Sequence, residues 1–84
     1  MPTIGDVAAA NMRAERARRR WTQADLAQRL NWSPTKVGDV EQGRRKVSAD
    51  QLVELCRAFG IPLRRLLDGA EPDDLITLGI EPLP

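Results

Sequence analysis

Residues 21–43 read W-T-Q-A-D-L-A-Q-R-L-N-W-S-P-T-K-V-G-D-V-E-Q-G, and this stretch decides the fold of the chain. It predicts two short helices joined by a tight turn. Thr22 is a good N-cap residue, and Asp25 follows three residues later, as an acidic variant of the capping box. Asn31 stands where the first of these helices must end, because Asn is one of the few non-glycine residues that tolerate a left-handed backbone.

The second of these helices begins with Ser33 as its N-cap and Pro34 at its first position, where no amide hydrogen is needed, and it ends before Gly43. Residues three and four apart share a helix face. Val37, Val40 and Glu41 share one side of this helix, and we expect that side to face the core because valines belong there. We expect the opposite side to face outward, with Lys36 at its edge and with Thr35, Gly38, Asp39 and Gln42 across it.

Together the two helices resemble the helix-turn-helix of the phage-repressor and Cro family, also called the xenobiotic-response-element type. The resemblance is carried by Thr22-Gln23, Leu26-Ala27, the turn Asn31-Trp32-Ser33, Val37 and Val40-Glu41-Gln42-Gly43. It extends from Met12 to Leu67, about two thirds of the chain. It implies an all-α fold, a compact bundle of about five short helices with a lambda-repressor-like DNA-binding domain, and binding to double-stranded DNA.

Outside this stretch the sequence predicts a helix from about Val7 to Arg19, capped by Asp6 and preceded by a loose arm over residues 1–5. Ser48 caps a fourth helix that ends at Gly60. Its inward stripe consists of Leu52, Leu55, Cys56 and Phe59, with Val53 alongside, and Cys56 reads as an ordinary buried thiol. A short fifth helix is expected over residues 63–67, and the flanking residues Trp21 and Trp32 are expected to act as apolar plugs over the core.

Residues 71–80, E-P-D-D-L-I-T-L-G-I, predict one more short helix. Its apolar residues are Leu75, Ile76, Leu78 and Ile80. Two interpretations stay open, since this surface can fold back on its own domain or form a contact between subunits. We therefore divide the chain into a helix-turn-helix domain over residues 1–69 and a packing or dimerisation extension over residues 70–84, in which residues 81–84 are expected to be disordered.

A chain of 84 residues suits one small domain, whose core is marginal, so that dimerisation can add stability. The net charge of +1 is unevenly distributed. Residues 1–46 hold ten basic and five acidic residues, whereas residues 47–84 hold three and seven. A basic half that carries a DNA-reading motif is consistent with a phosphate-facing surface, and an acidic half suits solvent or a protein partner.

The composition argues against several other functions. The chain has no His, the commonest acid–base group, and its one Cys has no second Cys or His with which to hold zinc. We therefore expect no enzymatic activity, no cofactor and no metal. No apolar run approaches the ~18 residues of a membrane span, no secretion signal is present at the N-terminus, and a single Cys fits a reducing cytoplasm.

The resemblance implies that the outward face of the second motif helix enters the major groove, where its first residues meet base edges. The candidate base contacts are Pro34, Thr35, Lys36 and Asp39. Pro34 can touch only apolar groups such as a thymine methyl. Asp39 can accept from cytosine N4, or it can orient Lys36 or a nearby Arg. Gly38 either allows backbone and DNA to approach closely or is a neutral substitution.

With Lys36, Asp39 and Glu41 the recognition helix carries a net charge of −1, so its attraction to DNA must come from its flanks. The candidate phosphate contacts are Arg19, Arg20, Gln23, Gln42, Arg44, Arg45 and Lys46. Gln23 matches the position that contacts a phosphate in the resembling family. The arginines at 18–20 are also explained by favourable charge at a helix C-terminus. The resemblance, together with inward periodicity, further implies an ion pair between Arg16 and Glu41.

These observations predict a sequence-specific transcriptional regulator that binds a double-stranded DNA operator, most simply a homodimeric repressor. The alternative is a protein-interaction role on the same fold, such as an antitoxin whose apolar tail binds a second protein.

Overall fold

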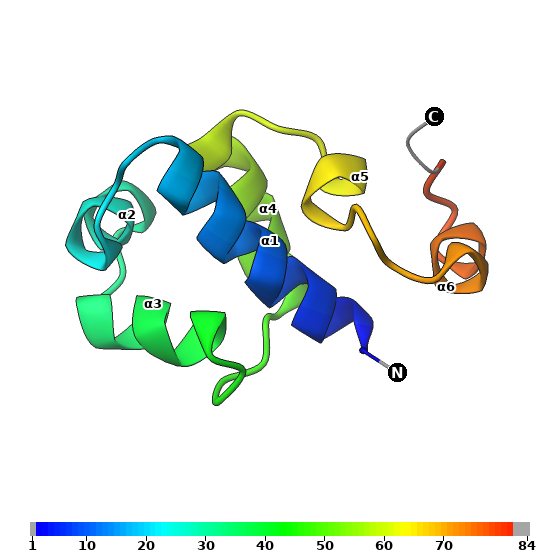
Figure 1. Cartoon of the computed structure of the whole chain (residues 1–84), viewed down its shortest axis with the longest axis horizontal. Helices are drawn as coiled ribbons and strands as arrows, with labels where there is room; N and C mark the ends of the chain where they lie inside the picture. The colour runs from blue at the N-terminus through cyan, green and yellow to red at the C-terminus, as the bar shows by residue number, and fades with distance from the viewer. Residues whose placement is uncertain (1, 82–84) are drawn as a thin grey trace.

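The computed structural model describes residues 2–81 of the chain, which form six helices and the segments that connect them. The helices are α1 (Ile4–Arg18), α2 (Gln23–Leu30), α3 (Pro34–Glu41), α4 (Ala49–Phe59), α5 (Leu63–Leu66) and α6 (Pro72–Thr77). The long helix α1 runs through the middle, with α2 and α3 at one end of the molecule and α6 at the other (Figure 1). The all-α bundle expected from the sequence is confirmed.

Polar residues at the predicted positions set the ends of α2, α3 and α4. The Thr22 hydroxyl accepts from the amide of Asp25 at 3.0 Å, and the Asp25 carboxylate accepts from the amide of Thr22 at 2.8 Å, which completes the capping box. Asn31 ends α2 in the left-handed conformation with φ 58°. Ser33 caps α3, and Ser48 caps α4 in a second such box. These predictions are confirmed.

The start of α1 differs from the prediction. Thr3, not Asp6, is the N-cap, and Asp6 is the third residue of the helix. The Thr3 hydroxyl accepts from the amide of Asp6 at 3.1 Å, and Asp6 accepts from the amide of Thr3 at 2.9 Å. The helix therefore begins at Ile4, and Gly5 is helical, so the expected loose arm over residues 1–5 is wrong for the residues that are described.

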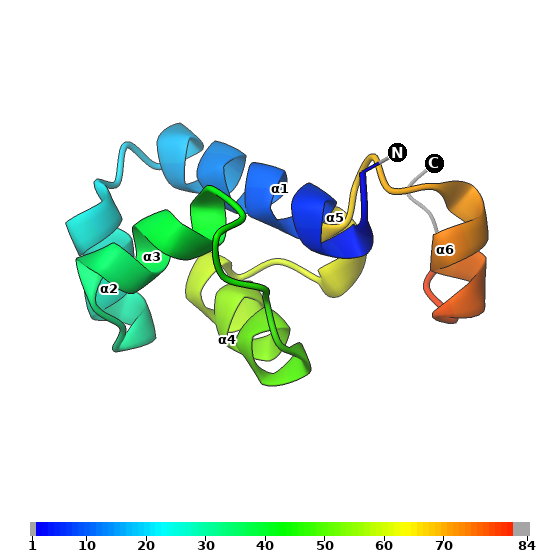
Figure 2. The same cartoon turned by 90° about the horizontal axis from the view of Figure 1, so that it is seen from below.

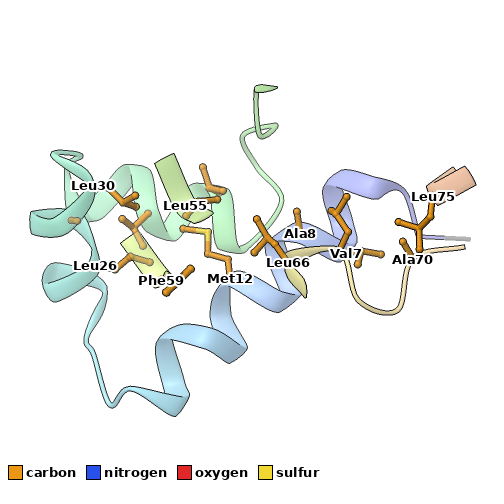
Figure 3. Packing of buried hydrophobic residues seen from close by; sticks show 14 residues of the cluster. Val7, Ala8, Met12, Leu26, Leu30, Leu55, Phe59, Leu66, Ala70 and Leu75 are labelled. Carbon is orange, nitrogen blue, oxygen red and sulfur yellow. The ribbon is translucent and has the colours of Figure 1, made fainter. Parts of the chain in front are cut away.

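The core lies between α1, α2, α3, α4 and α5. Met12 of α1 has no exposed surface and lies among Leu26, Leu55 and Phe59 (Figure 3). A second group of the same cluster gathers around the first turns of α1, where Val7, Ala8, Leu66, Ala70 and Leu75 meet. The apolar face of α1 thus joins both ends of the molecule.

On α4 the inward stripe is narrower than predicted. Leu55 and Phe59 are buried, whereas Cys56 is only partly buried and Val53 is 50% exposed. The expected burial of the Cys56 thiol is therefore incomplete. The pKa of Cys56 lies above its ordinary value because burial disfavours the thiolate.

Both tryptophans pack against the core as expected. The Trp21 ring stacks on Phe59 with ring centres 5.9 Å apart, and the Arg29 guanidinium lies 3.9 Å from the centre of the Trp21 ring. Stacked aromatic pairs and cation–π contacts add to the stabilisation that burial alone gives.

The C-terminal extension packs on its own domain through part of its apolar surface and leaves the rest exposed. Leu75 is buried beside Val7 and Ala70, and Ile80 packs partly against the core. Ile76 and Leu78 remain 68% and 54% exposed. Figure 2 shows α6 standing beside the start of α1, well away from α3.

Of the expected disordered segment, residues 82–84 lie outside the described residues. Among residues 2–81, no helix has the length and hydropathy to cross a bilayer.

A buried carboxylate joins α1 to α5. Glu15 is 3% exposed and accepts hydrogen bonds from the guanidinium groups of Arg18 and Arg19, each at 2.8 Å, and of Arg65 at 3.2 Å. Burial by itself would raise the pKa of Glu15, but the hydrogen bonds from Arg19 and Arg65 outweigh it and hold the pKa below its ordinary value.

A second buried carboxylate joins α1, α2 and α3. Glu41 is 1% exposed. Its Oε2 accepts from Arg16 Nε at 2.7 Å, and its Oε1 accepts from Arg16 Nη2 at 3.2 Å and from Gln23 Nε2 at 3.1 Å. The expected ion pair between Arg16 and Glu41 is present, and Arg13 adds a hydrogen bond to the main-chain oxygen of Glu41.

We predict that Glu41→Ala lowers the free energy of unfolding by roughly 3 kcal/mol, because it strands the partly buried Arg16 guanidinium. Thermal and denaturant unfolding monitored by circular dichroism measure it. The control is Glu54→Ala, which removes an exposed carboxylate with a single neutral partner, Trp32. An unfolding midpoint for Glu41→Ala equal to that of the control would contradict the prediction.

We predict that Glu15 contributes to the loss of stability in acid. A carboxyl group whose folded pKa is depressed stabilises the fold above its unfolded pKa, about 4.5 for Glu, and loses this contribution as the pH falls through its folded pKa. Glu15→Gln should therefore be less stable than the wild type at pH 7 and should lose less further stability below pH ~4.5. Melts between pH 7 and pH 2 test this, and parallel curves for the two proteins would exclude it.

Candidate DNA interface

The helix α3 presents one buried face and one open face. Val37, Val40 and Glu41 are buried, as periodicity predicted. Pro34, Thr35 and Gln42 are exposed, and Lys36 and Asp39 are half-buried. In the turn before α3, Ser33 Oγ accepts a hydrogen bond from the amide of Lys36 at 3.1 Å. This bond fixes the first turn of the helix. All four candidate base contacts of α3 thus keep at least part of their surface accessible.

Gly38 departs from this pattern. It is buried, and a Cβ added to it would lie 3.4 Å from Oε1 of Gln23. The expected outward position of Gly38, with close approach to DNA, is therefore wrong. Its missing side chain leaves room for Gln23, so that the start of α2 lies directly against α3.

Lys36 and Trp32 form a pair at the turn. The Lys36 Nζ lies 4.4 Å from the centre of a Trp32 ring, and the indole Nε1 donates to Glu54 on α4 at 3.2 Å. This contact holds the ammonium group beside the first turn of α3.

Asp39 is engaged by the loop that follows α3. Its Oδ1 lies 3.1 Å from both Nε and Nη2 of Arg44, and its main-chain oxygen accepts from the amides of Arg44 and Arg45 at 2.9 and 3.2 Å. Gln42 accepts a further hydrogen bond from Arg44. The sequence left open whether Asp39 orients Lys36 or a nearby Arg. In the structure its partner is Arg44 and not Lys36.

The remaining basic candidates separate into two groups. Arg20, Arg45 and Lys46 are exposed. Arg19, by contrast, donates to the Glu15 carboxylate and, at 2.7 Å, to the main-chain oxygen of Phe59, and its guanidinium lies 4.9 Å from the centre of the Phe59 ring. These contacts hold α1 to the end of α4, and the role of Arg19 as a phosphate contact stays a prediction.

Gln23 occupies the first position of α2, as predicted, and its Nε2 is also a partner of Glu41. An amide nitrogen carries two hydrogens, so one remains for a second acceptor. Backbone amides at a helix start also favour anions. Gln23 thus stands where the buried ion pair and the open face of α2 and α3 meet.

Sequence reasoning missed two residues of α1 that hold this helix to others. Arg13 donates to the main-chain oxygen of Glu41, and Glu15 gathers three arginines. The helical spacing offered a signal for both, since Arg13 lies three residues before Arg16, and Glu15 lies three residues after the buried Met12. Periodicity could not identify their partners on other helices, which are Glu41 for Arg13 and Arg65 for Glu15.

Comparison with known proteins agrees with this geometry. Residues 8–68 match a family described as a helix-turn-helix domain. The multiprotein-bridging factor 1 of Schizosaccharomyces pombe is 39% identical over 62 residues, which cover 74% of this chain and 42% of that protein. The chain therefore spans less than half the length of this relative.

Two solved structures are similar. The clp gene regulator ClgR of Corynebacterium glutamicum has a TM-score of 0.73 at 30% identity, covering 80% of this chain and 87% of that one. The restriction-modification controller protein C.AhdI of Aeromonas hydrophila has a TM-score of 0.68 at 29% identity, covering 74% and 94%. The chain therefore belongs to the helix-turn-helix domain family, in its phage-repressor and Cro-like branch.

Proposed function

We propose that the chain is a homodimeric, non-enzymatic, cytoplasmic repressor that binds one double-stranded DNA operator. The observation that carries this proposal is the open side of α3. The first turn of α3 is exposed at Pro34 and Thr35. The basic segment Arg44-Arg45-Lys46 lies in the loop after the end of this helix. A recognition helix in the major groove uses its N-terminal residues for bases and its surroundings for phosphates.

Within this proposal, base reading falls to the start of α3. Thr35 can hydrogen-bond to several bases or pack its methyl on thymine, Lys36 favours guanine, and Pro34 offers only apolar contact. Asp39 acts through Arg44, which it holds beside the end of α3. Phosphate contact falls to Arg20, Gln23, Gln42, Arg44, Arg45 and Lys46.

A homodimer suits this function for two reasons. One recognition helix covers only a few base pairs, and symmetric half-sites about 34–36 Å apart present two such helices to one face of the duplex. A domain of this size also has little core of its own, so that burial between subunits adds stability. We propose residues 1–69 as the DNA-binding domain and residues 70–84 as the extension that serves dimerisation.

A second candidate function is a protein-interaction role, such as that of an antitoxin. The observation in its favour is the exposed apolar surface of Ile76 and Leu78. One relative is named a bridging factor, which also fits contact with other proteins. Gel filtration of the protein alone, followed by binding to random duplex DNA at two salt concentrations, separates the two. A monomer without salt-dependent DNA affinity would favour the interaction role.

We predict that replacing Arg44, Arg45 and Lys46 together by Ala weakens binding to operator and random DNA alike. For every phosphate that the variant no longer neutralises, the magnitude of the slope of log K against log salt should fall by about 0.9. Fluorescence anisotropy titrations at four salt concentrations measure this slope. The control, Arg18→Ala, removes an exposed charge that already pairs with Glu15 and should leave the slope unchanged. If only operator binding suffered in the triple variant, these residues would be reading bases instead.

We predict that Asp39→Ala weakens binding to operator and random DNA alike, because Arg44 loses the partner that holds it beside the end of α3. Because Asp39 works through Arg44, the effects of Asp39→Ala and Arg44→Ala should be non-additive in a double-mutant cycle. Selection from a random duplex library with the Asp39→Ala protein tests preference directly. Tighter binding to every sequence, or a changed motif, would contradict this prediction.

A further inference from the structure

An apolar groove lies between α4 and α5, on a part of the molecule that the DNA interface does not use. Its volume is about 630 Å³, within the range of concave sites that bind other molecules. Its apolar lining includes Leu52, Val53, Cys56, Ile61 and Leu63. Arg57 is the charged residue that lines it, and the exposed Arg64 follows Leu63 directly. The groove is therefore apolar within and basic beside it.

The extension carries a surface of the opposite kind. Ile76 and Leu78 are 68% and 54% exposed on and just after α6, although both are large apolar residues. The acids Glu71, Asp73 and Asp74 are exposed at the start of the same helix. Residues 66–84 contain no Lys or Arg. The extension is therefore an apolar surface with acidic surroundings, complementary in both respects to the groove.

We infer that α6 of one copy docks into the α4–α5 groove of a second copy, and that the second copy returns the same contact. This inference deepens the proposed homodimer and rests on it. Ile76 and Leu78 enter the groove, and Asp73 and Asp74 face Arg57 and Arg64. Two identical contacts related by a two-fold axis close on themselves, which gives a dimer rather than a filament.

The groove of the same chain is not the partner. Leu75 holds α6 against Val7 and Ala70 at the start of α1. Figures 1 and 2 both show α6 at one end of the molecule, separated from α4. Within one molecule the two surfaces remain apart, whereas a second copy can bring both pairs together. The helices α2 and α3 lie at the other end, so this contact leaves the recognition helix open.

Sedimentation velocity of the full chain over a range of concentrations tests this arrangement. Ile76→Asp disables the extension, and Val53→Asp disables the groove; both residues are at least half exposed, so neither change disturbs the core. Each variant alone should have its dimer dissociation constant raised about tenfold or more, because a charge replaces a buried aliphatic group. An equimolar mixture of the two should recover part of the association, since one intact extension then meets one intact groove. Gln28→Asp, an exposed substitution on α2, is the control and should dimerise as the wild type does.

The other outcomes overturn the inference in distinguishable ways. A loss confined to Ile76→Asp means that two extensions pair with each other, and a loss confined to Val53→Asp means that two grooves do. A dimer that both variants leave intact removes the docking contact and keeps the proposed homodimer. A wild type that is monomeric both free and on operator DNA removes the homodimer as well.

Cys56 gives a second readout within the groove. It is the one cysteine of the chain and is partly exposed there. Its rate of reaction with a thiol reagent should fall as the wild-type concentration rises through the dimer range, and it should stay constant for Ile76→Asp. A rate independent of concentration for a dimeric wild type would contradict docking in the groove.

Discussion

The carboxylate of Glu41 is the contact on which the arrangement of the DNA-binding end depends. It is buried at the end of α3, and its partners come from two other helices, Arg16 on α1 and Gln23 on α2. A buried charge without partners costs several kcal/mol. Any shift of α3 along or around its axis would separate Glu41 from these donors. The ion pair therefore selects one position for α3, and the open side of that helix is fixed as a consequence.

Pairing also changes the charge that α3 presents. Counted from the sequence, the helix has two acids against one Lys. In the structure Glu41 is neutralised from inside by Arg16, and Asp39 lies 3.1 Å from Arg44. Among residues 2–81, Lys36, Arg45 and Lys46 take part in no ion pair. The side that is proposed to face DNA is therefore positive, because both acids of the helix already have cationic partners.

The sequence was sufficient wherever the determining interaction is local. Two capping pairs whose members lie three residues apart, Thr22 with Asp25 and Ser48 with Gln51, set the starts of α2 and α4. Asn31 sets the end of α2. In the structure the same spacing joins Thr3 to Asp6 at the start of α1. The prediction that Asp6 is the N-cap therefore placed the start of this helix too late. Contacts between distant segments were not accessible in this way. Periodicity placed Gly38 outward because it could not show that Gln23 lies over it, and it left Arg19 free because Glu15 and Phe59 are reached only through tertiary packing.

The helix α1 connects the extension to the end of the molecule that carries α3. At one end Val7 packs with Leu75 of the extension, and at the other Arg16 binds Glu41 of α3. In between, the Asn11 side chain donates to the main-chain oxygens of Leu66 and Asp68 at 2.7 and 2.8 Å, which holds the end of α5 to the same helix. A dimer reads two half-sites only if the distance between its recognition helices is fixed. One path from the extension to α3 runs through α1, so a subunit contact at α6 would bear on that distance.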